Sequence, residues 1–139
     1  MRKLLLLFVS MLLFSCISDY KKLEEDEDFT YGVYKTFEKA DNGCYIFTFE
    51  KRLKSGRNTD VIRRILVKSK KIEGYANYSY SLMRIKYDFK NNEETVVSIR
   101  DYNSNDSLLY SNDALKDHFQ SVSPEDPNYV VARQLLLRR

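Results

Sequence analysis

Few residues in this chain belong to the types that commonly carry out chemistry. There is one histidine, His118, and there are two cysteines, Cys16 and Cys44. His118 stands in no HExxH, GxSxG or glycine-rich phosphate-binding pattern, so we expect it to be a surface or packing residue. The five acidic side chains at 24–28 lack the ligand spacing of a metal site and would attract cations only loosely. The sequence therefore predicts a protein that is not an enzyme and binds no metal or cofactor.

Cys16 carries the clearest chemical signal. Arg2 and Lys3 precede an apolar run at 4–14, which is shorter than the ~20 residues that a membrane-spanning helix needs. The run ends in "LFSC", which resembles the lipobox of bacterial lipoproteins. This pattern predicts a signal peptide at 1–15, its removal, and attachment of diacylglyceryl and acyl groups at Cys16. The alternative is an ordinary secretory signal in which the cysteine is incidental.

The residues after Cys16 bear on location. Residues 16–29 are highly charged and have little apolar surface to bury, so they predict an acidic, flexible tether. Ile17 stands where an aspartate would retain a lipoprotein in the inner membrane, and its presence favours the outer membrane. An acidic run behind the lipidated cysteine also resembles a signal for display on the cell surface. A solvated spacer explains the same run equally well.

Length and charge limit the remaining choices. Cleavage after residue 15 leaves 124 of the 139 residues, enough for one domain at 30–139. The signal removes two of 23 cationic residues, which leaves 21 against 20 acidic residues and gives no reason to expect nucleic-acid binding. Cys44 lies in the apolar stretch "CYIFTF" and is either buried in a strand or paired between two chains, of which burial is favoured.

The pattern of apolar residues predicts an α+β fold. In residues 79–89, apolar and polar side chains alternate strictly, which is typical of a strand with one wet face. Helical spacing of Val131, Ala132, Leu135 and Leu136 predicts one C-terminal amphipathic helix packed on the sheet. We predict an antiparallel meander of about six strands, at 30–39, 44–52, 61–69, 79–89, 95–102 and 107–111.

The C-terminal half resembles the surface-adhesin protein E family of small bacterial lipoproteins. The likeness covers about 60–137 and depends on "DFKN" at 88–91, "YNSN" at 102–105 and "FQSVSP" at 119–124. It implies a sheet covered by a terminal helix and the binding of host macromolecules. Family members often tie helix to sheet by a disulfide. Here Phe89 takes the place of the first cysteine and the second is missing, so an apolar contact is expected instead.

Two groups of residues are candidates for binding. Cations at 51–57, 63–64 and 68–71 would attract a sulfated glycan or an acidic protein if they share a face, and otherwise form a solvated surface. Tyrosines in "GYANYSY" would form a contact patch if exposed, and otherwise belong to the core. The candidate binding residues are Lys51, Arg52, Lys54, Arg57, Tyr75, Tyr78 and Tyr80.

Two functions remain open at this stage. The first is a surface lipoprotein that binds a host macromolecule, either a protein or a glycan. The second is a structural or accessory lipoprotein that faces the periplasm and docks on another envelope component. An open sheet also leaves edges through which a homodimer could form. Ser107, in "DSL" on a predicted turn, resembles a short O-glycosylation site of exported proteins.

Overall fold

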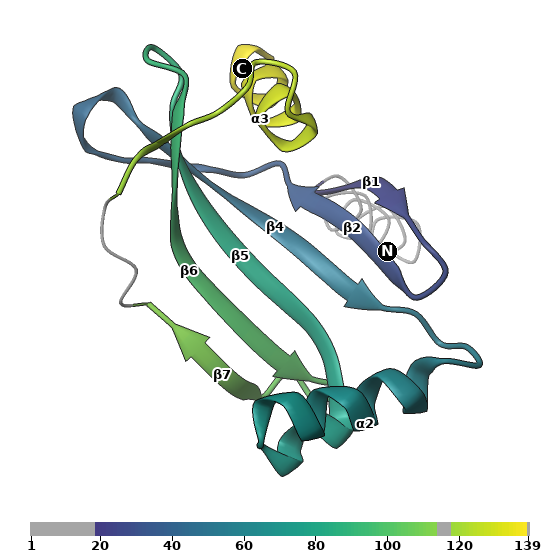
Figure 1. The fold of residues 1–139 in the computed structure, drawn as a ribbon. Helices are drawn as coiled ribbons and strands as arrows, with labels where there is room; N and C mark the ends of the chain where they lie inside the picture. Colours follow the sequence, from purple (N-terminus) through teal and green to yellow (C-terminus); the bar gives the residue numbers. More distant parts are fainter. Residues whose placement is uncertain (1–18, 114–117, 139) are drawn as a thin grey trace, which may run out of the picture.

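The computed structural model describes residues 19–113 and 118–138, which form one sheet and two α-helices (Figure 1). The predicted signal peptide and the lipidation site Cys16 lie outside the described residues. Strand bounds are β1 (Tyr20–Glu25), β2 (Phe29–Tyr34), β3 (Glu38–Lys39), β4 (Tyr45–Leu53), β5 (Tyr78–Asp88), β6 (Glu93–Asn103), β7 (Leu108–Asn112) and β8 (Gln120–Ser121). The helices are α2 (Thr59–Lys70) and α3 (Pro127–Leu137), with short 3-10 turns η1 (Asp41–Gly43) and η2 (Glu73–Asn77).

The sheet is an antiparallel meander with the order β1-β2-β4-β5-β6-β7. Short strand β3 pairs with β4, and β8 pairs with β6. The predicted fold class is confirmed, because α3 packs on this sheet as the single C-terminal helix. The segment predicted as one strand at 30–39 is divided into β2 and β3, and both pair with β4.

Strand β1 corrects the described part of the flexible tether predicted at 16–29, of which residues 16–18 lie outside the described residues. Residues Tyr20–Glu25 pair with β2 in spite of their charge. The Tyr20 ring lies over Gly32, where any Cβ atom would collide with it, and packs edge-on against Tyr34 at 5.5 Å between centroids. Aromatic contacts across the pair therefore stabilise a strand that its charge pattern did not predict.

Helix α2 corrects the prediction of a strand at 61–69. The hydroxyl of Thr59 donates to the Lys54 carbonyl (2.6 Å) and accepts from the Gly56 amide (2.9 Å), which fixes the turn before the helix. Lys71 ends the helix in the left-handed conformation, with φ 58°. Basic residues in the last turn complement the helix dipole.

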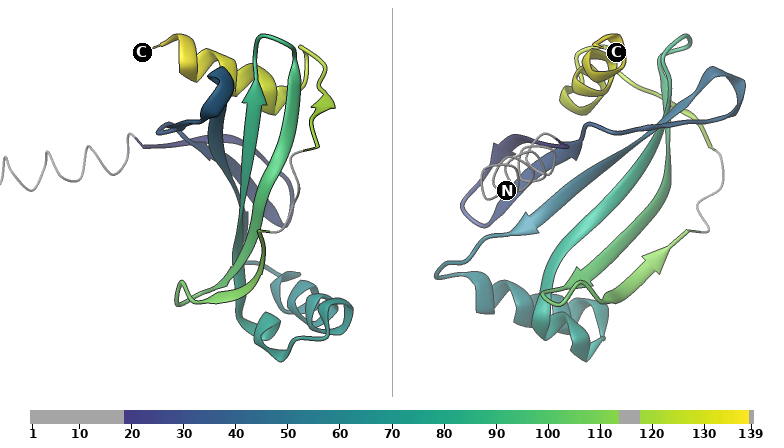
Figure 2. Two further views of the ribbon diagram at one scale, coloured as in Figure 1. Left: turned by 90° about the vertical axis from the view of Figure 1, so that its left-hand side faces the viewer. Right: turned by 180° about the vertical axis from the view of Figure 1, so that it is seen from behind.

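The core lies between α3 and one face of the sheet. Tyr129 and Ala132 of α3 are fully buried against Val33, Phe47 and Tyr87 of three different strands. The Asp126 carboxylate caps α3 by accepting hydrogen bonds from the backbone amides of Asn128 and Tyr129, both at 3.1 Å. Figure 2 shows α3 across one end of the sheet and α2 at the other end.

Cys44 is buried, with 4% of its surface exposed. This agrees with the favoured prediction, in which the thiol packs inside the domain beside β4. The pairing of β6 with β5 is irregular at one point, because the register shifts between Arg84 and Ile85. Ile99 still faces Met83, whereas Val96 takes the position opposite Ile85.

Candidate binding surface

Three of the predicted basic residues are engaged in contacts within the domain. The ammonium of Lys51 lies 4.1 Å from the centroid of the Phe29 ring. Lys54 pairs with Glu25 at 3.4 Å and donates to the carbonyl of Asp26 at 3.1 Å. These cations join β4 to the β1–β2 hairpin, so their position favours a role in packing.

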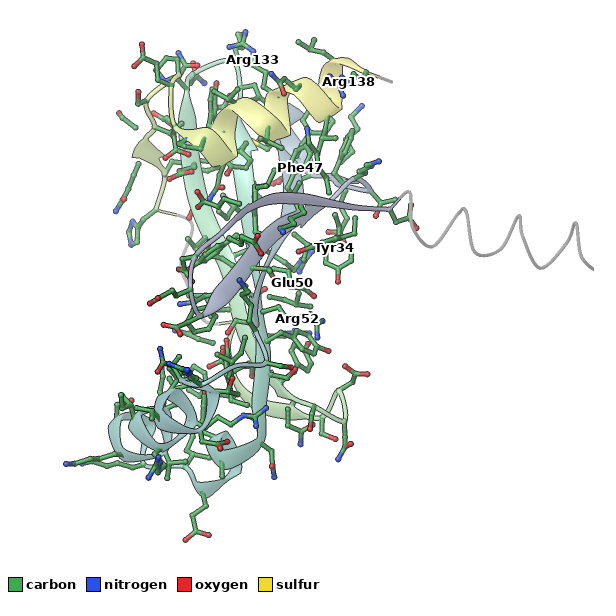
Figure 3. The ribbon with its side chains drawn as sticks, turned by 90° about the vertical axis from the view of Figure 1, so that its right-hand side faces the viewer. Tyr34, Phe47, Glu50, Arg52, Arg133 and Arg138 are labelled. Carbon is green, nitrogen blue, oxygen red and sulfur yellow. The ribbon has the colours of Figure 1, made fainter. Side chains whose placement is uncertain are left out.

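Arg52 belongs to a cluster on the sheet face opposite α3 (Figure 3). Its guanidinium donates to both carboxylate oxygens of Glu50, at 2.8 and 3.3 Å, and lies 4.2 Å from the Tyr80 ring centroid. Glu50 is only 5% exposed and accepts a further bond from the Tyr34 hydroxyl at 3.1 Å. The pKa of Tyr20 is raised to about 12, mainly by burial and to a smaller extent by the nearby negative charge of Glu50. The cluster neutralises a buried carboxylate and is structural.

Of the two alternatives for the tyrosines, the contact patch is wrong and burial is confirmed, because Tyr75, Tyr78 and Tyr80 are 0%, 4% and 9% exposed. Tyr75 donates to Asp101, which also accepts from the Ser81 hydroxyl at 2.6 Å. Burial raises the pKa of Tyr78 to about 12. The pKa of Tyr80 is also raised to about 12, mainly by burial and to a smaller extent by the hydrogen bond to Asp106. The tyrosines form an internal network, the alternative that the sequence left open.

The outer surface of α2 gathers exposed cations around two apolar side chains. Val61, Arg64, Ile65 and Lys68 stand at spacings of three and four residues and therefore share one side of the helix, which we call the α2 face. Val61 is 44% and Ile65 is 59% exposed, and both cations are exposed as well. Arg57 lies exposed just before the helix, so the last of the predicted basic residues flanks this face.

The α2 segment is strongly cationic. Residues 57–73 hold six cationic side chains and only two acidic ones, Asp60 and Glu73. Arg63 points inward and donates to the carbonyl of Tyr78 at 3.0 Å, while Lys70 lies 5.4 Å from the Tyr110 ring centroid. Among the described residues, no ion pair involves Arg64 or Lys68. The positive charges of the α2 face are therefore not neutralised by described carboxylates of the domain and are accessible to a partner.

This surface has the chemistry of a receptor for acidic groups. An arginine fork binds sulfate or carboxylate through two parallel hydrogen bonds, and a lysine adds a point charge. Exposed Val61 and Ile65 add apolar contact between the charges. The sequence signals the cations at 63–64 and 68–71, but assigning them to a strand hides the spacing that brings Arg64 and Lys68 together.

A groove of about 590 Å³ lies between the start of α3 and the middle of the sheet. Its floor is apolar, formed by Phe49, Met83 and Ile99, and Val131 closes one side. Of the predicted binding residues, Lys51 alone lines it. The groove is an apolar recess, and this character distinguishes it from the charged α2 face.

Other sites for chemistry are few in the described ranges. No group of three or more His, Cys, Asp or Glu side chains there is arranged to hold a metal ion. His118 is exposed beside residues that the structure does not describe. Residues 19–113 and 118–138 contain no helix long and apolar enough to cross a bilayer.

Comparisons with protein-family models, with curated proteins and with solved structures found no match to this chain.

Proposed function

We propose that this protein is an outer-membrane lipoprotein, anchored through Cys16, that acts without catalysis and binds acidic macromolecules through the α2 face. The observation that carries the proposal is the grouping of exposed Arg64 and Lys68 around exposed Val61 and Ile65. Resemblance to the surface-adhesin protein E family supports the same role, and points to a host macromolecule as the partner.

The position of α2 suits this role. In the left view of Figure 2, β1 begins on one side of the molecule and α2 lies at the bottom on the other side. A chain anchored through Cys16, three residues before Asp19, would carry the α2 face away from the membrane. A cationic surface held in that position accelerates encounter with acidic partners, and salt screens the effect.

The binding test uses heparin as a soluble sulfated glycan and the chain from residue 16 onward, which contains every described element. Arg64→Gln/Lys68→Gln should weaken binding about tenfold or more, because two charges on the contact surface are removed. Unfolding free energy should stay within about 0.5 kcal/mol, since both side chains are exposed. Calorimetric titration and denaturant unfolding measure the two quantities.

The matched control is Lys90→Gln/Arg133→Gln, which removes the same charge from exposed positions at the α3 end of the molecule. It should bind heparin as the unaltered chain does. Equal losses in the two double variants would mean that net charge, rather than the α2 face, governs binding, and would contradict the proposal.

Location is tested separately. Intact-mass measurement of protein from the cell envelope should show an acylated Cys16 and no residues 1–15. Protease added to intact cells should remove the domain if it is displayed on the surface. Protection until the envelope is permeabilised would favour the alternative, an accessory lipoprotein that faces the periplasm.

A further inference from the structure

A second basic surface is formed by residues near the two ends of the described chain. A recess of about 770 Å³ opens between the start of β1, the segment after β2 and the end of α3. Its lining includes Lys21, Lys22, Lys35 and Arg138, with Tyr20 and Leu135 beside them. We call this recess the β1–α3 pocket.

The lining of the β1–α3 pocket contains four cations and no acidic side chain. Lys22 is partly neutralised by Glu25, whose carboxylate lies 3.0 Å away. In the described part of the chain, Lys21, Lys35 and Arg138 take part in no ion pair. Lys35 and Arg138 are exposed and Lys21 is half-buried. The pocket is therefore suited to a multiply charged anion that three separate segments can reach together.

The β1–β2 hairpin separates its charges along its length. Cationic Lys21, Lys22 and Lys35 lie where the hairpin opens, and the acidic residues 24–28 lie at its turn. Figure 3 shows the end of α3, with Arg138, on the same side of the molecule as the start of β1. The cationic end of the hairpin and the end of α3 therefore form one positive surface.

The attachment point limits how far this surface can lie from a membrane. Only residues 17 and 18 separate Cys16 from Asp19, and three residue steps span about 10 Å at full extension. This step rests on the proposed lipid anchor. An anchored chain holds the β1–α3 pocket within reach of the headgroups next to its own acyl chains.

We propose that the β1–α3 pocket is a docking surface for the anionic phospholipid headgroups of the leaflet that holds the Cys16 anchor. Phosphate oxygens accept hydrogen bonds from the side chains of Lys21, Lys35 and Arg138. Tyr20 adds an amphipathic contact at the membrane interface, and Leu135 adds an apolar one. A flexible anchor would leave the domain free to turn. Headgroup contacts at this pocket fix one face toward the bilayer and turn the acidic hairpin tip away from it.

The test uses the chain from residue 16 onward with Cys16→Ser, so that no acyl group contributes to binding. Flotation with vesicles of phosphatidylcholine, alone or mixed with phosphatidylglycerol, measures partitioning at low salt. The chain should bind only the anionic vesicles, and Lys21→Gln/Lys35→Gln should reduce the partition coefficient about fivefold for each lysine removed. Lys90→Gln/Arg133→Gln, with the same net charge, should partition as the parent chain does.

Three results would overturn the proposal. The first is equal partitioning of the pocket variant and the parent chain, and the second is an equal loss in the control variant. The third is protection of Lys21 and Lys35 from amine labelling by inorganic phosphate but not by anionic vesicles, which would assign the pocket to a soluble anion. Because this chain lacks the acyl group, the result is independent of whether Cys16 is modified, a question that the intact-mass measurement answers.

Discussion

The two helices lie at opposite ends of one sheet, and the chemistry that attaches them differs. Beneath α3, aromatic rings pack together with little polar contact: Tyr129 meets the ring of Tyr87 at 5.7 Å between centroids, and Phe47 meets Tyr87 at 6.0 Å. Next to α2, the buried rings of Tyr75 and Tyr78 belong to a hydrogen-bonded network that ends on Asp101.

The difference separates a helix that stabilises the fold from one that presents a surface. Helix α3 buries Tyr129 and Ala132, whereas no residue of α2 is fully buried. Helix α2 is fixed through its neighbours, by the Arg63 bond to the Tyr78 carbonyl and by the turn η2. Its outer side chains are therefore free to serve binding with little cost to the core.

The largest effect should come from the α3 end. Tyr129→Ala removes a fully buried ring and the 2.6 Å bond from its hydroxyl to Asn92. The cavity should lower the free energy of unfolding by about 3–5 kcal/mol, a large part of the stability of a small domain. Denaturant unfolding followed by fluorescence measures it, and a loss below about 1 kcal/mol would show that α3 contributes little to the core.

An intermediate effect is expected at the α2 end. Tyr75→Phe keeps the buried ring but removes the hydroxyl that donates to the Asp101 carboxylate. Within the described ranges, the Asp101 carboxylate then keeps only its bond from Ser81, so the free energy of unfolding should fall by about 2 kcal/mol. The same unfolding experiment detects it. No change on removing this hydroxyl would mean that the network is not what holds η2 in place.

The smallest effect should have the opposite sign. Tyr87→Phe makes the same substitution beneath α3, where the Tyr87 hydroxyl is buried and has no hydrogen-bond partner among the described residues. Burial raises the pKa of this phenol above its usual value, in keeping with its dry surroundings. Removing an unsatisfied hydroxyl should raise the free energy of unfolding by about 1 kcal/mol. A destabilised Tyr87→Phe would erase the contrast between the two ends.

The α3 end was predictable from sequence because its signals are local. Strict alternation through Met83, Ile85 and Tyr87 and helical spacing through Val131 and Leu135 each indicate which side chains face the core. An apolar contact between Phe89 and the terminal helix was also expected, and the Phe89 ring does pack against Tyr129 at 5.4 Å between centroids.

The α2 end was predicted less well because its signals conflict. Val61, Ile62 and Ile65 are β-branched and favour a strand, although 61 and 65, like 62 and 66, stand four residues apart as in a helix. The stretch that holds Tyr75, Tyr78 and Tyr80 reads the same whether these rings are exposed or buried. The carboxylates that accept hydrogen bonds from Tyr75 and Tyr80 belong to Asp101 and Asp106, and each lies 26 residues further along the sequence. Such pairing is visible only once the strands are aligned.

The order of the elements along the chain has a consequence for biogenesis. Each strand pairs mainly with one that precedes it closely in sequence, so the sheet can assemble progressively as the chain emerges into the compartment where it folds. Helix α3 follows all the other described elements in chain order, and until it docks, Val33, Phe47 and Tyr87 remain open to solvent and to other chains. A chain that ends before residue 127 would therefore expose this apolar surface and tend to aggregate. Chaperones would bind it, or proteases would degrade it.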